Sequence, residues 1–411
     1  MEVLAPADGP TGEWTLLTRE WEGLAARAGA VFATPAWAWS AHRHTGRGWP
    51  LVITARDEGD LVGLLALTVR RRCGLSILSF LGAGPSDYGT ILVDPDSPQD
   101  QPRILDALLD AARAVVPGSL LDLEQVSDAD PVLPLLQDWG RRRGLSVHCR
   151  RQSESMQEVF QVERGVPVPP KTRSMRRHGH RTLRLLESLG EVEVLADLLS
   201  RVPTRAEVLS LADECAAVDA GHPQAKRRTH PWRGPSGALL RDFLSAAPSS
   251  SRWLSGVRVD GRLVAYQLDL VAPSTVATYY ASYHADVAPF GVGTYLESQS
   301  RVRAAKAGAA QIDFLRGMQP YKLRAANVQH TSYRVQLVPG GVIRGSHGRA
   351  VGAALAWRQI VRRHRRLVNG VRRVLRLGPG LPARSCRASA GRRRPVSGTP
   401  THPGDDPPPA A

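Results

Sequence analysis

The pattern of apolar positions in the first third of the chain predicts a hairpin followed by alternating strands and helices. Apolar residues at 104, 105, 108, 109, 112, 115 and 116 have helical spacing, whereas the strands are short apolar runs. The polar turn at 57–60 contains a glycine, which is typical of a β-hairpin. The expected elements are a helix from Thr34, strands at 51–56, 61–69, 76–81, 90–93 and 120–123, and helices at 103–116 and 131–143.

The later part of the chain repeats this order. The expected elements are a linker at 165–170, helices at 172–189, 205–218, 237–246 and 291–306, and strands at 192–195, 253–259, 263–271, 275–283 and 312–315. Asp260-Gly261 is a strong turn signal between two of these strands. Hairpin, strand, helix and strand thus occur twice, at 51–123 and at 253–315. We interpret the chain as two copies of one α/β unit with helices between them.

Length and cysteine use narrow the class of protein. A chain of 411 residues is long enough for two ordinary domains. The first residues lack the pattern of a signal peptide. The sequence contains no run of about 18 apolar residues, which a membrane-spanning helix would need, so we expect a cytoplasmic protein. The four cysteines form no C-x-x-C pair, so we expect neither a disulfide framework nor a bound metal.

The positive charge is concentrated in the last part of the chain. Residues 342–411 contain 15 Arg, no Lys and two Asp, a net charge of +13, which leaves +3 of the total +16 for residues 1–341. We therefore do not expect the folded body to bind nucleic acid. Residues 349–377 combine an apolar stripe with arginines, as in an amphipathic helix that contacts an anionic membrane; packing on the body and RNA binding are the alternatives. Residues 378–411 have the composition of a disordered tail.

The glycine turn before the helix at 291–306 is the first candidate site. The first turn of a helix has unpaired N–H groups and a partial positive charge, and glycines let a phosphate approach the backbone closely. Gly291, Val292, Gly293 and Thr294 would hold a pyrophosphate in this way. The alternative is an ordinary strand-to-helix turn.

The second candidate site follows the strand at 312–315. Lys322 could hold a phosphate or a developing negative charge, and Tyr321 could protonate a leaving thiolate. A surface lysine beside a packed tyrosine is the alternative. His284 ends the strand that leads to the glycine turn, and histidine is a residue type that commonly transfers protons in enzymes, so His284 is a third catalytic candidate, or a loop histidine. Other candidates near the expected cleft, each more simply explained by a structural role, are Asp269, Tyr279, Tyr280 and Asp313.

Two further polar regions could contact an acceptor. The helix at 171–184 is dense in cations and could grip a phosphate-bearing acceptor, although a solvated helix with leucines packed inward explains the same pattern. His222, His230, Trp232 and Arg233 occupy a loop that could line the acceptor cleft. We expect no acid near the two histidines and no metal at this loop.

Residues 313–324, with the motif Arg-Gly-x-x-Pro-Tyr-Lys, resemble the C-terminal signature of GNAT acetyltransferases of the cellulose-biosynthesis-associated (CelD/BcsL) type. The run Ser86-Asp87-Tyr88 resembles that family's N-terminal half, and the resemblance covers about 30–340. It implies a tandem GNAT fold of two mixed-sheet halves with flanking helices, related to Fem-type aminoacyl ligases. It also implies a C-terminal copy that binds acyl-CoA and a degenerate N-terminal copy. The expected segments are 1–164, 165–190, 191–341, 342–377 and 378–411.

The resemblance has two departures. Ala288 stands where GNAT proteins usually have Gln or Arg, so a side-chain contact to the pyrophosphate is missing, and Gln319 stands where many relatives have an acid. The expected function is an acetyl-CoA-dependent acyltransferase without a metal, acting on an amine or hydroxyl of a small molecule or sugar precursor of an envelope polymer. The alternatives are a Fem-like transferase that uses aminoacyl-tRNA, and a non-catalytic GNAT scaffold held by its basic tail.

Overall fold

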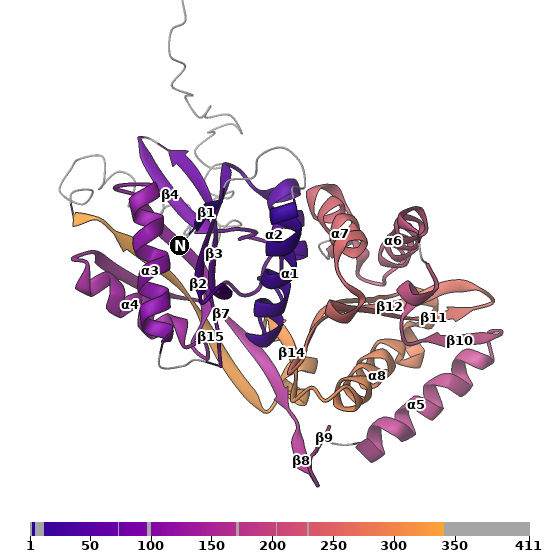
Figure 1. Cartoon of the computed structure of the whole chain (residues 1–411). Helices are drawn as coiled ribbons and strands as arrows, with labels where there is room; N and C mark the ends of the chain where they lie inside the picture. Colours follow the sequence, from indigo (N-terminus) through magenta and orange to yellow (C-terminus); the bar gives the residue numbers. More distant parts are fainter. Residues whose placement is uncertain are drawn as a thin grey trace, which may run out of the picture. The chain divides into compact units, whose positions relative to one another are not determined.

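The computed structural model describes residues 2–4, 12–72, 74–96, 100–169, 172–202, 204–227 and 230–340, all within the unit Met1–Arg349 (Figure 1). The predicted basic helix at 342–377 and the predicted disordered tail at 378–411 lie outside the described residues. Within the described ranges, no helix has both the length and the apolar character needed to cross a membrane.

The first half of the chain contains every helix and strand predicted for it, together with α1, β1 and β7, which the sequence pattern did not indicate. Thr34 caps α2 by accepting a hydrogen bond from the Trp37 N–H, and Pro35 occupies the first helical position. The elements are β1 (Glu2–Leu4), α1 (Gly12–Arg27), α2 (Pro35–Thr45), β2 (Trp49–Asp57), β3 (Asp60–Arg72), β4 (Leu75–Phe80), β5 (Leu92–Val93), α3 (Gln101–Val115), β6 (Leu120–Ser127), α4 (Val132–Arg142) and β7 (Ser146–Val159).

The second half begins with a short hairpin where a linker was expected. Residues 161–163 (β8) and 166–168 (β9) pair antiparallel, and Arg164 and Gly165 form the tight turn between them, with positive φ values of 54° and 80°. The prediction of an irregular linker at 165–170 is therefore wrong for residues 166–168. The elements are β8 (Gln161–Glu163), β9 (Val166–Val168), α5 (Thr172–Glu187), β10 (Val192–Leu195), α6 (Arg205–Ala220), α7 (Gly234–Ala246), β11 (Arg252–Val259), β12 (Arg262–Ala272), β13 (Thr275–Tyr283), η4 (Ala285–Phe290), α8 (Val292–Lys306), β14 (Gln311–Arg316), α9 (Pro320–Ala325) and β15 (Val328–Val338).

The predicted repeat is confirmed by the strand pairing. In the first copy β2, β3 and β4 pair antiparallel in sequence, and α3 leads to β6, which lies parallel to β4. In the second copy β11, β12 and β13 pair antiparallel, and α8 leads to β14, which lies parallel to β13. Even the hairpin turns correspond: Glu58-Gly59 and Asp260-Gly261 all have positive φ, the conformation that a two-residue turn between twisted strands requires.

The two copies exchange their last strands. β7 follows the first copy along the chain but pairs with β14 of the second, whereas β15 follows the second copy and pairs with β6 of the first. β7 and β15 also pair with each other along their lengths. All strands except β8 and β9 therefore form one 13-stranded sheet that runs through both halves (Figure 1). The exact segment boundaries within 1–341 remain a prediction.

Helices cover both faces of the sheet in each half. In the second half α6 and α7 lie on one face of β12, and α5 and α8 lie on the other (Figure 1). The first half uses α1 and α2 on one face, with α3 and α4 on the other. Contact between α2 and α7 joins the halves, because the fully buried Trp37 packs against Phe243 with ring centroids 5.2 Å apart.

Candidate active site

Parallel pairing in the second half stops before β14 ends. β13 and β14 pair only through residues 275–277 and 311–313. β13 then continues to Tyr283, whereas Leu315 takes a left-handed conformation with a φ of 59° and β14 pairs with β7 on its other side. Ligands of open α/β sheets bind outside the carboxyl ends of the strands, where neighbouring strands stop pairing. The end of β14 is therefore the place where a substrate would be expected.

Five polar side chains gather there, and we call them the strand-end cluster: Asp87, Tyr88, Asp313, Arg316 and Lys322. The Tyr88 hydroxyl donates a hydrogen bond to Asp313 Oδ1 at 3.1 Å. Arg316 Nε donates to Asp87 Oδ1 at 2.5 Å, and the Arg316 backbone N–H donates to Asp87 Oδ2 at 3.1 Å. The turn at residues 86–88 of the first half is thus held against the strand end of the second half.

Asp313 is the buried carboxylate of the cluster. Three donors reach it: the Tyr88 hydroxyl, Gln157 Nε2 at 2.8 Å from Oδ2, and the Leu315 N–H at 2.7 Å from Oδ1. These donors favour the charged form, but burial outweighs them and raises the pKa of the Asp313 carboxyl above its ordinary value. The carboxyl therefore holds a proton more strongly than the carboxyl of a solvated aspartate does.

Lys322 is the buried cation of the cluster. Only 5% of the residue is exposed, and its Nζ donates to the carbonyl oxygens of Arg316 at 2.7 Å and Leu315 at 3.4 Å. Burial lowers the pKa of the Lys322 ammonium to about 8, while the carboxylates of Asp87 and Asp313 act in the opposite direction. Tyr321 next to it on α9 is 42% exposed, so the predicted Tyr–Lys pair consists of one buried and one surface residue.

The glycine turn forms the beginning of α8. Gly291 precedes the helix with a φ of 73°, and Val292 is buried, so Val292 can offer a ligand only its backbone N–H. Gly293 is half-buried, and Thr294 is exposed. His178 of α5 lies against this turn, with Nε2 3.4 Å from the Gly291 carbonyl oxygen. The turn thus begins a helix, as the sequence predicted, and its role in holding a phosphate stays a prediction.

His284 contacts the start of η4 through its side chain and β12 through its backbone. Its Nδ1 lies 2.9 Å from Asp286 Oδ2 and 3.4 Å from the Asp286 N–H, at the start of η4. Its backbone N–H donates to Val264, and the neighbouring Ala285 N–H donates to Gly221. These contacts join the end of β13 to β12 and to the end of α6, and they include no member of the strand-end cluster.

A second buried network was not foreseen. Asp219 is 1% exposed and accepts hydrogen bonds from the hydroxyls of Tyr280 at 2.8 Å and Ser282 at 3.1 Å. His230 Nδ1 lies 2.6 Å from Asp219 Oδ2, so the expectation that no acid lies near this histidine is wrong. The acid lies 11 residues earlier, at the end of α6, and only the folding of the loop brings the two together. Among the described residues, no group of three His, Cys, Asp or Glu could hold a metal ion.

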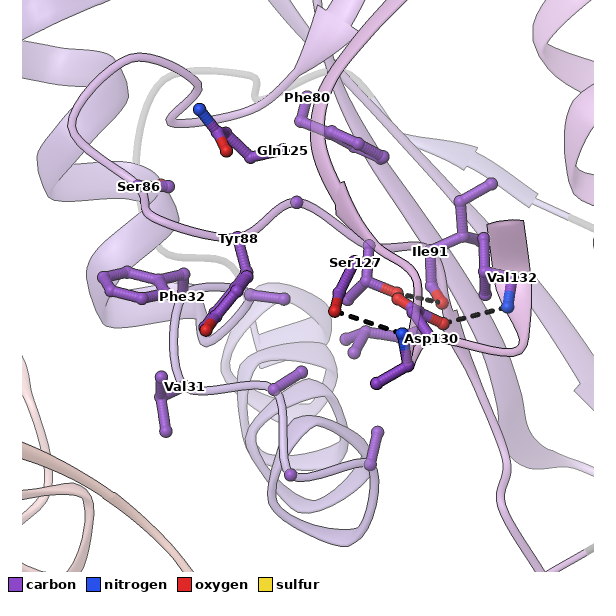
Figure 2. Close-up of a pocket in the computed structure, with 18 of the residues that line it drawn as sticks. Val31, Phe32, Phe80, Ser86, Tyr88, Ile91, Gln125, Ser127, Asp130 and Val132 are labelled. Atoms are coloured by element: carbon purple, nitrogen blue, oxygen red, sulfur yellow. Dashed lines mark hydrogen bonds between the residues drawn. The ribbon is translucent and has the colours of Figure 1, made fainter. Parts of the chain in front are cut away.

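A cavity of about 300 Å³ adjoins the strand-end cluster (Figure 2). It lies where β4 and β6 stop pairing, after Leu78 and Leu121, and Gln125 has a φ of 64° there, as Leu315 has in β14. Loops around Val31 and Ile91 form much of its wall, and Asp313 belongs to its lining from the second half. None of the described residues that line it is Lys, Arg or His, whereas three are acids: Glu124, Asp130 and Asp313.

Asp269 lies outside the cluster but is also fully buried, between β12 and α8. It accepts hydrogen bonds from Gln267 Nε2 at 2.9 Å and Ser300 Oγ at 2.8 Å. Burial raises the pKa of its carboxyl from 3.8 to about 6. The native state therefore binds more protons than the unfolded state between these values, and the associated stabilisation, complete below pH 3.8, is lost as the pH rises through about 6.

Replacing Asp269 with Asn should stabilise the protein above pH 6, by about 2 kcal/mol, and this advantage should vanish below pH 4. The new amide can donate to Gln267 Oε1, which accepts no hydrogen bond within the described part of the chain. Urea unfolding of both proteins at pH 4 and pH 7.5 measures the difference. An equal effect at the two pH values would contradict the assignment of a raised pKa to Asp269.

Comparison with known proteins identifies the fold. Residues 173–323 match the family model described as Acetyltransferase (GNAT) domain. FemX has 11% identity and a TM-score of 0.51, covering 83% of this chain and 98% of FemX. A conserved protein of unknown function from Bacteroides thetaiotaomicron has 11% identity and a TM-score of 0.52, covering 82% of this chain and all of that protein. A tandem GNAT protein from the clavulanic acid biosynthesis pathway has 13% identity and a TM-score of 0.40, covering 82% and 98%. No curated protein matches the chain.

The matched residues include the glycine turn, β14, Asp313 and Lys322, which are the parts of the second copy described above. The chain is thus a mixed α/β protein of GNAT-type fold, and its residues 173–323 match the model of a GNAT acetyltransferase domain.

Proposed function

We propose that this protein is an acyltransferase that uses an acyl-CoA, most simply acetyl-CoA, as its donor and transfers the acyl group to an amine or hydroxyl. The observation that carries the proposal is the position of Lys322. Lys322 is a buried ammonium at the end of β14 within the GNAT-matched residues, and from there it could reach an acyl group that lay between β13 and β14. A sugar or another envelope-polymer precursor of the cellulose-associated type is the proposed source of the acceptor.

The first turn of α8 would hold the pyrophosphate of the donor. The backbone N–H groups of residues 292–294 belong to the first turn of a helix and therefore favour an anion. α5 packs against this turn and carries exposed arginines that could approach phosphate groups: Arg176, Arg177, Arg181 and Arg184. Ala288 offers no side-chain donor, so the arrangement relies on the backbone and on α5.

Lys322 would stabilise the charge that develops during transfer. The acceptor nitrogen or oxygen attacks the thioester carbonyl, a new C–N or C–O bond forms, and the C–S bond breaks to release the thiolate of CoA. Two N–H bonds of the Lys322 ammonium point to the carbonyls of Leu315 and Arg316, and the third can donate to the carbonyl oxygen of the substrate. Attack on the thioester carbonyl turns its oxygen into an oxyanion. Because the two backbone carbonyls already hold the Lys322 ammonium in position, the ammonium does not have to move to stabilise this oxyanion.

A Fem-like transferase that takes its acyl group from aminoacyl-tRNA is the second candidate. The fold similarity to FemX, which extends over both halves, favours it, and the exposed arginines of α5 would suit an RNA donor as well as CoA. The third possibility, a scaffold without activity, is opposed by the buried Lys322, because burying an ammonium is costly and a purely structural position is more simply filled by an apolar side chain.

Changing Thr294 to Glu should weaken acetyl-CoA binding by about tenfold or more, because it places a carboxylate where the pyrophosphate would lie. Thr294 is exposed in the first turn of α8, where an acid favours the helix, so the fold should be unharmed. Thr294→Gln has the same shape without the charge and should bind like wild type. Isothermal titration calorimetry with acetyl-CoA measures all three proteins.

Two outcomes would reject the donor proposal. Equal acetyl-CoA affinity in the Glu and Gln variants would remove the pyrophosphate from the first turn of α8. A wild-type protein that binds neither acetyl-CoA nor longer acyl-CoAs would exclude the CoA donor, and aminoacyl-tRNA would then be titrated in its place.

A further inference from the structure

We propose that the protein docks on an anionic membrane surface through α5 and the β8–β9 hairpin. The basic side chains of α5 would lie against the lipid headgroups, and the valines of the hairpin would enter the interface between headgroups and acyl chains. These elements are part of the described structure and are made of other residues than the segment at 349–377, for which membrane contact was predicted from the sequence. The proposal does not depend on the acyl donor or on the acceptor.

One face of α5 carries only basic side chains. Residues 171–186 contain six Lys or Arg, two His and no acid. Successive residues of a helix are about 100° apart, so the exposed basic residues span an arc of about 140°. We call them the α5 basic face: Arg176, Arg177, His180, Arg181 and Arg184. A ligand with many negative charges is needed to contact the whole face.

The opposite face of α5 is packed against the protein. His178 lies against the Gly291 carbonyl oxygen, and the Thr182 hydroxyl donates to the Phe290 carbonyl oxygen at 2.8 Å. Leu186 is completely buried. The α5 basic face is thus turned away from the first turn of α8, and a single pyrophosphate bound there could contact only the edge of this face.

The charges of the α5 basic face are not neutralised by other described residues. No ion pair in the described part of the chain involves its four arginines, whereas Arg151 before them and Arg201 after them pair with Glu154 and Glu193. A group of exposed charges of one sign attracts a polyanion. Next to an anionic bilayer, each arginine strengthens binding by about fivefold.

The hairpin supplies the apolar part of the surface. β8 and β9 pair with each other and not with the large sheet, and residues 161–166 are all exposed. Val162 and Val166 are 69% and 56% exposed, more than any other large apolar residue of the described ranges. Apolar side chains exposed in this way are unfavourable in water and are stabilised when they enter a lipid interface.

The hairpin and α5 lie close together. Residues 169–171 are all that separates β9 from α5, so the Cα atoms of Val168 and Thr172 are at most about 14 Å apart. Both elements also pack on α8. Figure 1 shows them along the same lower edge of the body. One bilayer could therefore contact the valines and the α5 basic face together.

The combination favours a lipid surface over an RNA. Proteins that bind single-stranded RNA stack its bases on aromatic side chains, and β8, β9 and α5 contain no Phe, Tyr or Trp. A double-stranded RNA would contact the arginines but would leave the exposed valines in water. An anionic membrane offers phosphate groups to the arginines and an apolar boundary to the valines.

Hydrogen–deuterium exchange of the full chain, followed by mass spectrometry, locates the contact. Vesicles of phosphatidylglycerol and phosphatidylcholine in equal amounts should slow exchange in residues 161–187, and vesicles of phosphatidylcholine alone should not. Unchanged exchange in these residues with the anionic vesicles would overturn the proposal, even if the vesicles bind elsewhere on the chain. Slowing by a structured RNA or by oligouridylate, without slowing by vesicles, would assign the surface to RNA instead.

Vesicle flotation with matched variants measures the contribution of the arginines. The triple variant Arg176→Gln, Arg177→Gln and Arg184→Gln should weaken binding to the anionic vesicles by about tenfold or more at low salt. The control replaces the three exposed arginines at 70–72 with Gln, which removes the same charge from β3, and should stay within about threefold of wild type. An equal loss in the two triple variants would show attraction by net charge alone and would overturn the proposal.

The same assay at about 0.5 M salt measures the contribution of the valines, because the arginines are then screened. The double variant Val162→Ser and Val166→Ser should weaken binding by about fivefold, whereas Leu16→Ser, at an exposed leucine of α1, should bind like wild type. A hairpin variant that binds as well as wild type would remove the apolar contact and with it the lipid assignment. The melting temperature of each variant shows that its fold is intact.

Discussion

Replacing Lys322 with Met should reduce acyl transfer by about 100-fold or more while acetyl-CoA still binds with nearly the affinity of wild type. Met retains the length and apolar stem of the side chain but removes the donor to the developing oxyanion. Since the ammonium must be protonated to donate, and burial lowers its pKa to about 8, the wild-type kcat/KM should fall as the pH rises above 8. A lysine acting as a base would give the opposite slope.

Thiol release from acetyl-CoA in the presence of a panel of amines measures this rate from pH 6 to pH 10. Lys306→Met, at an exposed lysine at the end of α8, is the control for loss of a positive charge and should behave like wild type. A rate for Lys322→Met within threefold of wild type would contradict the role given to the ammonium. The melting temperature of each variant separates a loss of activity from a loss of fold.

Replacing Arg301 with Met should lower the free energy of unfolding by about 3–5 kcal/mol. Arg301 of α8 is 7% exposed and forms ion pairs with Glu158 of β7 and, at 2.7 Å, with Glu297. Because β7 comes from the first half, this pair fastens the exchanged strand to the second half. Removing the guanidinium leaves the buried Glu158 carboxylate without its partner.

The double variant Arg301→Met with Glu158→Gln should recover at least half of the lost stability, because the buried charge is then also removed. Urea unfolding at pH 7 measures both proteins. A single variant that costs less than about 1 kcal/mol, or a double variant that is no better than the single one, would show that the pair does not hold β7 in place.

The repeated unit could be predicted because its elements have local signals. The strands at the centre of each copy are apolar runs, and Asp260-Gly261 and the glycine turn at 57–60 mark the hairpins. β7 and β15 lacked such signals. β7 contains several polar and charged residues in succession, and residues 148–151 are exposed. Its pairing with β14 and β15 therefore depends on the folded sheet and could not be predicted from its own pattern.

The candidate site was only partly predictable for the same reason. Lys322 could be selected because a strand, a glycine and a proline precede it, and Asp313 was named as a residue near the cleft. Asp87 and Tyr88 were noticed through family resemblance alone, and their link to the end of β14 joins residues more than 220 positions apart. The cavity and the Asp219–His230 pair both depend on how loops fold against the ends of helices and strands, and these loops carry no periodic signal.

A crystal structure of the protein with a non-hydrolysable analogue of acetyl-CoA is the most direct test of the account. We predict that the pantetheine arm lies between β13 and β14, with the pyrophosphate at the N–H groups of residues 292–294. The carbonyl oxygen should lie about 3 Å from Lys322 Nζ. An analogue bound in the first-half cavity, or between β13 and β14 with its carbonyl directed away from Lys322, would contradict the assignment of the donor site and of its oxyanion donor.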